Sequence, residues 1–370
     1  MKKILTLTFI IISLLITPAF ADESDESKIL PSEIGVVKNV EYVDLNDSVT
    51  QTKQSIQVKI ITGQFKGETV TLDNMLTGNP YYDIKLKKNT KVILHAEDNG
   101  NGVEFSIEDI KRAGTLGWLS FIFCALLLYI GRKKGLFSLF SIGLTIILIT
   151  HVLSPLILMG VNPVLATLLI CLVSTAATMY LVGGFNAKSS SAVIGAILSL
   201  LFAGALSYII MLTAHLTGFA EENSMFLYTA HPELDFISIT ISTMIVATLG
   251  AVMDVAMSIA STINEIFLID TEKTVKDLFF SGMNVGRDII GTMANTLILV
   301  YLGGSLPLIL LAENIDLQKF INLNQVVTET ASALIGSIAI VICVPFTAIA
   351  ASQMIKHFSK KEEEITINCN

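Results

Sequence analysis

Residues 191–217 read SAVIGAILSLLFAGALSYIIMLTAHLT, a stretch that contains no Asp, Glu, Lys or Arg. A helix needs about 20 apolar residues to cross the hydrocarbon core of a bilayer, so this segment is long enough to span it. The sequence therefore predicts an α-helical polytopic membrane protein with about seven transmembrane helices. Six further apolar stretches of comparable length lie near 116–131, 136–157, 161–183, 236–258, 288–311 and 327–350.

The composition agrees with this prediction. Of 370 residues, 52% are hydrophobic and 15% are charged, whereas soluble domains average about 25% charged residues. These values argue against an ordinary soluble enzyme. The formal net charge of −8 leaves no basic excess to hold a nucleic acid, so we expect no nucleic-acid partner.

The amino end is predicted to be a signal peptide over residues 1–21. Lys2 and Lys3 precede a short apolar run, and Ala19-Phe20-Ala21 supplies a small-x-small cleavage pattern. A retained signal anchor is the alternative, because the sequence does not establish cleavage.

Residues 22–112 are predicted to form a small extracytoplasmic β domain. Apolar and polar residues alternate at 55–60 and 68–72, and further strand candidates lie at 36–43, 91–96 and 103–107. Five short strands indicate an antiparallel, barrel-like domain of OB or SH3 size. A transmembrane domain at 115–355 and a cytoplasmic tail at 356–370 are expected to follow.

Basic residues predict the orientation of the bundle. With the amino-terminal domain outside, ten Lys and Arg residues fall in inner segments and only Lys319 falls in an outer loop after that domain. This positive-inside bias predicts a multi-pass protein of the bacterial plasma membrane with a cytoplasmic carboxyl terminus. The ten residues are Arg132, Lys133, Lys134, Lys188, Lys273, Lys276, Arg287, Lys356, Lys360 and Lys361.

Two polar stripes interrupt the apolar helices. One begins in GAVMDVAMS at 250–258 and the other lies in GMNVGRDIIGTMANT at 282–296. Charged side chains inside a membrane cost several kcal/mol, so they need a partner, water or a function. The transport or ion-pair candidates on these stripes are Asp254, Ser258, Glu265, Arg287, Asp288, Thr292 and Asn295.

An ion pair between Asp254 and Arg287 is one interpretation of the stripes. Such a pair could clamp two helices permanently or form part of an ion or proton path, and the sequence leaves both readings open. The spacing of Gly282 and Gly286 favours close helix packing over an unwound segment. Leu278 to Phe280 and their charged neighbours suggest a short amphipathic helix at the inner surface.

Three histidines, His151, His215 and His231, are weak candidates for a divalent-cation site at the outer face. Only His231-Pro-Glu233 has a spacing that resembles a ligand pair, so structural roles are favoured. The four cysteines show no metal-ligand spacing and are predicted to pack as small apolar residues. No nucleotide-binding or hydrolase motif occurs in the sequence, so we expect no catalytic residues, no enzyme activity and no cofactor.

The membrane half resembles the YibE/F-like family of bacterial multi-pass membrane proteins. The resemblance covers about 116–356 and rests on GAVMDVAMSIAS at 250–261, SGMNVGRDIIGTMANTLIL at 281–299, TAHLTG at 213–218 and GGSLP at 303–307. It implies a polytopic membrane protein, often with an exported amino-terminal β domain. It adds weight to Asp254, Arg287, Asp288 and Asn295 as the residues to test, and it implies no particular substrate.

Two functions remain in competition at this point. The first is a transporter or permease for an ion or small solute, with a polar route between the fifth and sixth predicted helices. The second is a non-transporting envelope anchor or scaffold whose β domain binds a partner. The expected partners are the lipid bilayer and either a second copy of the chain or another membrane protein.

Overall fold

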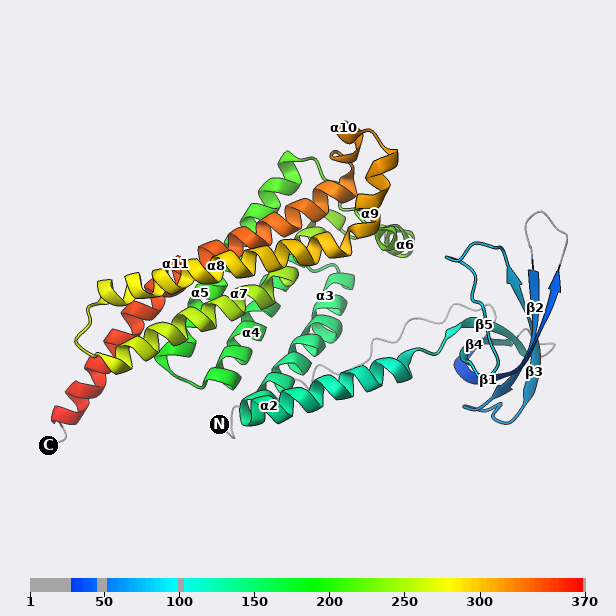
Figure 1. The fold of residues 1–370 in the computed structure, drawn as a ribbon, viewed down its shortest axis with the longest axis horizontal. Coiled ribbons are helices and arrows are strands. Elements are labelled where there is room, and N and C mark those ends of the chain that lie inside the picture. Colours follow the sequence, from blue (N-terminus) through cyan, green and yellow to red (C-terminus); the bar gives the residue numbers. More distant parts are fainter. Residues whose placement is uncertain (1–27, 45–51, 99–102, 369–370) are drawn as a thin grey trace. The chain divides into compact units, whose positions relative to one another are not determined.

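The computed structural model describes residues 28–44, 52–98 and 103–368. The predicted signal peptide at 1–21 lies outside these residues. The chain forms two compact units whose border falls inside the first long helix, between Leu126 and Leu127. Each unit is described separately (Figure 1).

The first unit contains a five-stranded antiparallel sheet with the strand order β3-β2-β1-β4-β5. Five strands were predicted and five are found, and they form a half-barrel. The central strand β1 pairs with β4 along its first half and with β2 along its second half, and a bulge interrupts each ladder. These bulges bend the 17-residue strand, so that it pairs with two different strands as the sheet curves. The strands are β1 (Lys28–Asp44), β2 (Thr52–Ile60), β3 (Thr69–Leu76), β4 (Lys91–Asp98) and β5 (Val103–Ile110).

Inward-facing residues of the sheet form a closed apolar core around Ile56, Val58 and Leu94, which are fully buried. Gln54 is also fully buried, and its side chain bonds both the N–H and the carbonyl of Leu86. The core therefore holds the segment between β3 and β4 through one satisfied polar side chain.

The second unit is a bundle of helices (Figure 1). Six helices of the described chain are long and apolar enough to cross a membrane. They comprise the run Ala113–Leu158 together with α4, α5, α7, α8 and the 324–358 part of α11. The helices are α2 (Ala113–Ile147), a π-helical turn (Leu148–Leu153), α3 (Ser154–Leu158), α4 (Pro163–Gly183), α5 (Ala187–Thr213), α6 (Glu222–Ala230), α7 (Phe236–Ile269), α8 (Val275–Gly304), α9 (Leu306–Leu311), α10 (Leu317–Phe320) and α11 (Asn324–Asn368).

The first of the six combines two of the seven predicted segments, 116–131 and 136–157. Its 46 residues would extend about 69 Å as one straight helix, more than twice the hydrocarbon core. The helix is broken at Arg132, whose φ of 48° and ψ of −126° are not helical. Gly135 permits the sharp turn there, because a Cβ at this position would clash with the Leu127 carbonyl oxygen.

The boundaries of α7 and α8 correct the sequence interpretation. The predicted segments were 236–258 and 288–311, and the stretch 264–280 was expected to hold a separate amphipathic surface helix. In the structure α7 continues to Ile269 and α8 already begins at Val275. Charged residues at 276, 277, 287 and 288 lower the local hydropathy, which is why the first half of α8 did not look membrane-spanning.

The predicted tail at 356–370 is likewise helical up to Asn368, because α11 continues through it. This helix forms the centre of the bundle, packing against α5, α7 and α8. Small residues dominate the contacts, and buried hydroxyls such as Ser199 and Ser207 donate to carbonyls four residues earlier in their own helices. Cys171 and Cys343 are buried among these residues, as predicted, and Cys124 is partly buried.

Candidate polar path between α7 and α8

Helix caps and one lysine fix the positions of α7 and α8. The Asp235 side chain accepts from the N–H groups of Ile237 and Ser238 and starts α7. Thr274 and Asp277 form a capping box that starts α8. The short turn between the two helices is tied to α11, because Lys356 Nζ donates to the Thr271 carbonyl at 2.6 Å.

The two helices pack closely through the glycines of α8. A Cβ at Gly282 would come 2.6 Å from Ile263 of α7, and one at Gly286 would come 3.2 Å from Ile259. The close packing predicted from their spacing is therefore found. Because the helices run antiparallel, this register sets the heights along the bundle. Residues at the same height are Ser258 and Arg287, and likewise Asp254 and Gly291.

Polar and small residues occupy the outward side of α7. Gly250, Asp254 and Ser258 recur every four residues and are all exposed in the isolated chain. Apart from the adjoining residues and the backbone of the same helix turn, no heavy atom of the described chain lies within 4 Å of the position that a Cβ at Gly250 would take. Glu265 is exposed on the same side, but it lies only four residues before the end of α7.

The outward side of α8 is polar along its middle. Asp288, Thr292 and Asn295 are exposed and share one face, as predicted. Arg287 and Asn284 extend this face by one turn, and both are exposed. Asn284 was not among the predicted candidates, although its spacing from Asp288 by one helical turn could have identified it.

Both carboxylates lie on the side of the α7–α8 pair that faces away from α11. On α7, the carbonyl of Val252 contacts the Cys343 thiol of α11 at 3.5 Å, and on α8, Gly286 packs against α11. Asp254 lies two residues after Val252, and Asp288 lies two residues after Gly286. Two residues rotate the side-chain direction by about 200° around a helix, so both carboxylates point away from α11. We call this surface the polar face. It comprises Gly250, Asp254, Ser258, Asn284, Arg287, Asp288, Thr292 and Asn295.

The anticipated ion pair between Asp254 and Arg287 is not formed. Arg287 Nη1 instead donates to Oδ1 of Asn284, one turn earlier on α8, at 2.9 Å. Ion pairs among the described side chains involve neither residue. The reason is geometric: both side chains are exposed and point outward from their helices rather than toward each other.

The outer-face histidines do not converge. His151 Nδ1 bonds the neighbouring Thr150 hydroxyl at 2.7 Å, and His231 Nδ1 lies 3.1 Å from Glu233 Oε1. A backbone N–H bond and the His231 ring hold the pKa of the Glu233 carboxyl below its ordinary value. His215 is exposed just after α5. The described residues contain no group of three side chains suited to a metal ion.

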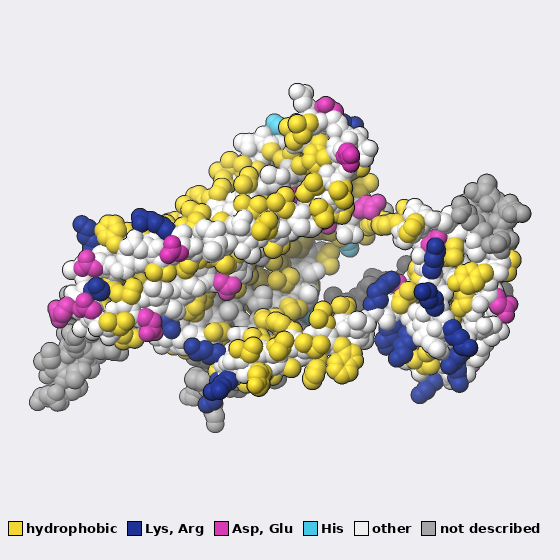
Figure 2. Space-filling model, in the orientation of Figure 1, with side chains coloured by type: hydrophobic (Ala, Val, Ile, Leu, Met, Phe, Trp, Pro, Cys, Tyr) yellow, Lys and Arg dark blue, Asp and Glu magenta, His cyan; other side chains and the backbone are white. Residues whose placement is uncertain are grey.

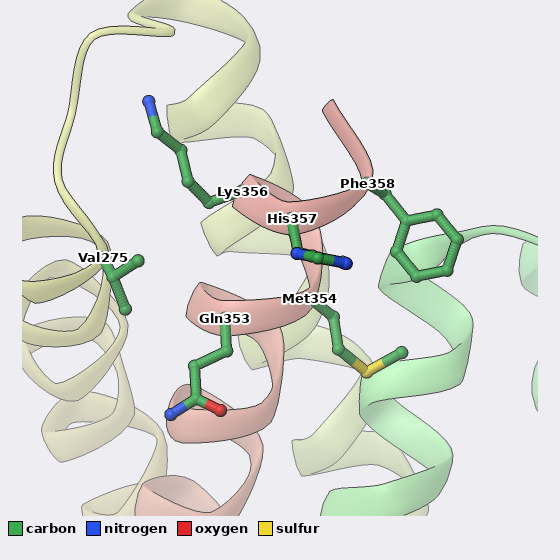
Figure 3. Close-up of a pocket in the computed structure, with 6 residues that line it drawn as sticks. All are labelled: Val275, Gln353, Met354, Lys356, His357 and Phe358. Atoms are coloured by element: carbon green, nitrogen blue, oxygen red, sulfur yellow. The ribbon is translucent and has the colours of Figure 1, made fainter. Parts of the chain in front are cut away.

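A pocket beside residues 353–358 of α11 does not bring reactive side chains together either. Val275 of α8 and five α11 residues line it, among them Gln353, Lys356 and His357. Figure 3 shows these side chains pointing away from α11 in different directions. Lys356 already donates a hydrogen bond to the α7–α8 turn.

These features define a class: a helical membrane-type bundle that follows an amino-terminal β half-barrel and carries one polar face at mid-helix. The model of the YibE/F-like protein family matches residues 119–357, and the model of the YibE/F family N-terminal domain matches residues 31–110. The chain therefore belongs to the YibE/F-like family, as the sequence motifs indicated. No curated protein and no solved structure matches it.

Proposed function

We propose that the chain is a transporter or permease for an ion or small solute, and that the polar face lines its path. The observation that carries the proposal is the position of charged residues in the middle of two long helices. Arg287 lies about 18 Å along α8, and Asp254 lies about 22 Å from the inner end of α7. Such charges cost several kcal/mol in hydrocarbon, and they characteristically mark ion and solute pathways.

The chemistry of the polar face suits a small polar or charged solute. The carboxylates of Asp254 and Asp288 can hold a cation or a proton, while the hydroxyls and amides of Ser258, Thr292 and Asn295 can replace water around it. Arg287 offsets part of the negative charge, so the face does not hold a cation too tightly to release it.

The distribution of charge supports an orientation with the β domain outside and the carboxyl end in the cytoplasm. The α4–α5 turn, the α7–α8 turn and the end of α11 lie at one end of the bundle (Figure 1). Lys188, Lys273, Lys276 and Lys356 belong to this end, where Figure 2 shows basic and acidic side chains interspersed. Arg287 no longer counts toward this bias, because it lies inside α8. The remaining basic residues still favour this end as the cytoplasmic one.

Charge movement in proteoliposomes tests the proposal. The panel comprises protons, sodium, divalent cations, phosphate and amino acids, and the variant is Asp254→Asn. The matched control is Asp270→Asn, which makes the same chemical change in the exposed α7–α8 turn. We expect Asp254→Asn to lower the wild-type flux by about tenfold or more, and the control to keep it. Equal flux in wild type and Asp254→Asn would contradict the role of the polar face.

A second function, a partner-binding envelope scaffold, draws on the β domain. Tyr42, Tyr81 and Tyr82 are 63%, 73% and 69% exposed, and exposed aromatic side chains are enriched at protein interfaces. Deletion of residues 22–111 separates the two functions. A scaffold would lose all activity in cells, whereas a permease would retain flux in proteoliposomes.

A further inference from the structure

No described residue of the isolated chain covers the polar face. Asp254, Arg287 and Asp288 are exposed on helices that are long enough to span a bilayer, and each lies near the helix middle. Acyl chains cannot solvate an arginine or a carboxylate, so in a membrane this face must meet water or another polar protein surface. This inference rests on the proposed function only in taking α7 and α8 to span the membrane.

The charges on the polar face indicate which protein surface packs against it. The run from 113 to 131 in α2 contains no charged residue, and the exposed side of α4 presents leucines such as Leu165 and Leu169. Neither offers a charged group for Arg287 or Asp288. A second α7–α8 pair does, because the polar face carries one guanidinium and two carboxylates and is complementary to itself.

The symmetry of two copies in one membrane brings unlike charges together. Both copies insert with the same orientation, so a two-fold axis along the membrane normal places α8 of each copy against α7 of the other. The register of α7 and α8 puts Arg287 at the height of Ser258, one turn from Asp254. A guanidinium can span this offset of about 6 Å, because the arginine side chain is long and flexible.

Two glycines leave room for such an approach. Apart from the adjoining residues and the backbone of the same helix turn, no heavy atom of the described chain lies within 4 Å of the positions that a Cβ would take at Gly250 and at Gly291. Both glycines are exposed, and small residues on an outward helix face let two backbones come close in a membrane.

We infer that the polar face is an interface between two copies of the chain, in which Arg287 of each copy pairs with Asp254 of the partner subunit. The polar path then runs between the copies, and neither copy encloses it alone. The same surface explains why Asp254, Arg287 and Asp288 form no ion pair among the described side chains.

Disulfide cross-linking between differently tagged copies in native membranes provides one test. One copy carries Gly250→Cys and the other carries Asn295→Cys, in a background with Cys124→Ser and Cys369→Ser; the buried Cys171 and Cys343 remain. The matched control replaces Gly250→Cys by Leu169→Cys, on an exposed apolar side of α4. We expect the first pair to form doubly tagged dimers at least about tenfold more than the control. Equal yields would overturn the inference.

A charge exchange between copies tests the pairing itself. A copy with Arg287→Asp carries acidic side chains at both positions 254 and 287. A copy with Asp254→Arg carries basic side chains at both positions. Each is therefore expected to fail as a homodimer, whereas a mixed dimer restores both pairs. We expect doubly tagged dimers to exceed singly tagged ones by about tenfold or more. Random mixing would overturn the pairing, and if the charge variants do not accumulate, the cysteine pair decides.

The outcomes separate this inference from transport. Cross-linked dimers without any flux would refute the proposed function and leave the interface standing. Flux from a protein that photobleaching steps show to be a single copy would refute the interface and leave transport standing.

Discussion

The guanidinium of Arg287 donates a 2.9 Å hydrogen bond to Oδ1 of Asn284, on its own helix, while Asp254 on the neighbouring helix takes part in none of the ion pairs among the described side chains. A single neutral acceptor does not compensate an arginine at mid-membrane. We therefore predict that Asn284→Ala weakens assembly or flux only modestly, whereas Arg287→Ala abolishes the function of the polar face. Flux and dimer yield of the two variants, measured side by side, check this ranking. Equal losses in both variants would contradict it.

Close packing of α8 gives a prediction about stability. Gly286 has no room for a side chain beside Val344 and Ile259, so Gly286→Leu should destabilise the bundle by about 2 kcal/mol or more. Thermal unfolding of the purified protein in detergent measures this. The control is Gly143→Leu in α2, because the space around a Cβ at Gly143 is open and leucine favours a helix over glycine. A control that unfolds as early as Gly286→Leu would show that the packing argument is wrong.

The anchor between α11 and the α7–α8 turn gives a local prediction. Lys356 donates to the Thr271 carbonyl and lies 5.5 Å from the centre of the Phe267 ring. Lys356→Met should lower stability by only about 1 kcal/mol, because the contact is partly exposed. It should nevertheless raise hydrogen exchange at residues 270–274. Lys319→Met, at the other end of the bundle, serves as the control and should leave the exchange there unchanged.

In the β domain, the buried side chain of Gln54 is expected to contribute strongly to the free energy of unfolding. Gln54→Leu leaves the Leu86 N–H and carbonyl without partners and should cost about 1–3 kcal/mol. Gln57→Leu makes the same change at an exposed position on the same strand. Chemical denaturation followed by a probe in the β domain should separate the two variants, and coincident curves would exclude the proposed role of Gln54.

The carboxyl of Asp109 is expected to make the stability of the β domain depend on pH. Backbone donation from Ile110 and the Arg112 guanidinium lower the pKa of its carboxyl below its ordinary value. Because the folded-state pKa is lowered, these bonds stabilise the fold above about pH 4, and their contribution is lost as the pH falls through the folded value. The difference in Tm between wild type and Asp109→Asn should therefore shrink on acidification. A difference that grows as the pH falls would contradict this sign.

Local sequence patterns predicted much of this fold, for identifiable physical reasons. Alternation located the strands because one face of each is buried, and apolar length located the helices. The first half of β1 was missed because Pro31 and Glu33 disrupt alternation, while pairing with β4 is a long-range effect. The first half of α8 was missed because its charged residues lower the local hydropathy. In the structure these charges face away from the bundle, so they do not disturb its packing.

The helix faces on which the candidate residues lie could be predicted more reliably than the contacts of these residues. Helical spacing alone placed Asp288, Thr292 and Asn295 on one face. It could not show that Arg287 bonds Asn284, because a contact between helices depends on how each is rotated about its axis. The packing of Gly282 and Gly286 sets that rotation, and it became known only with the structure.

Access of water to the polar face tests the central claim most directly. Ser258→Cys and Asn295→Cys, introduced singly into the Cys124→Ser, Cys369→Ser background, are exposed to a membrane-impermeant cationic thiol reagent in intact membranes. Leu169→Cys is the exposed apolar control. A solute path predicts that both polar-face cysteines react far faster than the control. Labelling of both at the slow rate of Leu169→Cys would mean that the face is sealed from water, and the proposed path would not exist.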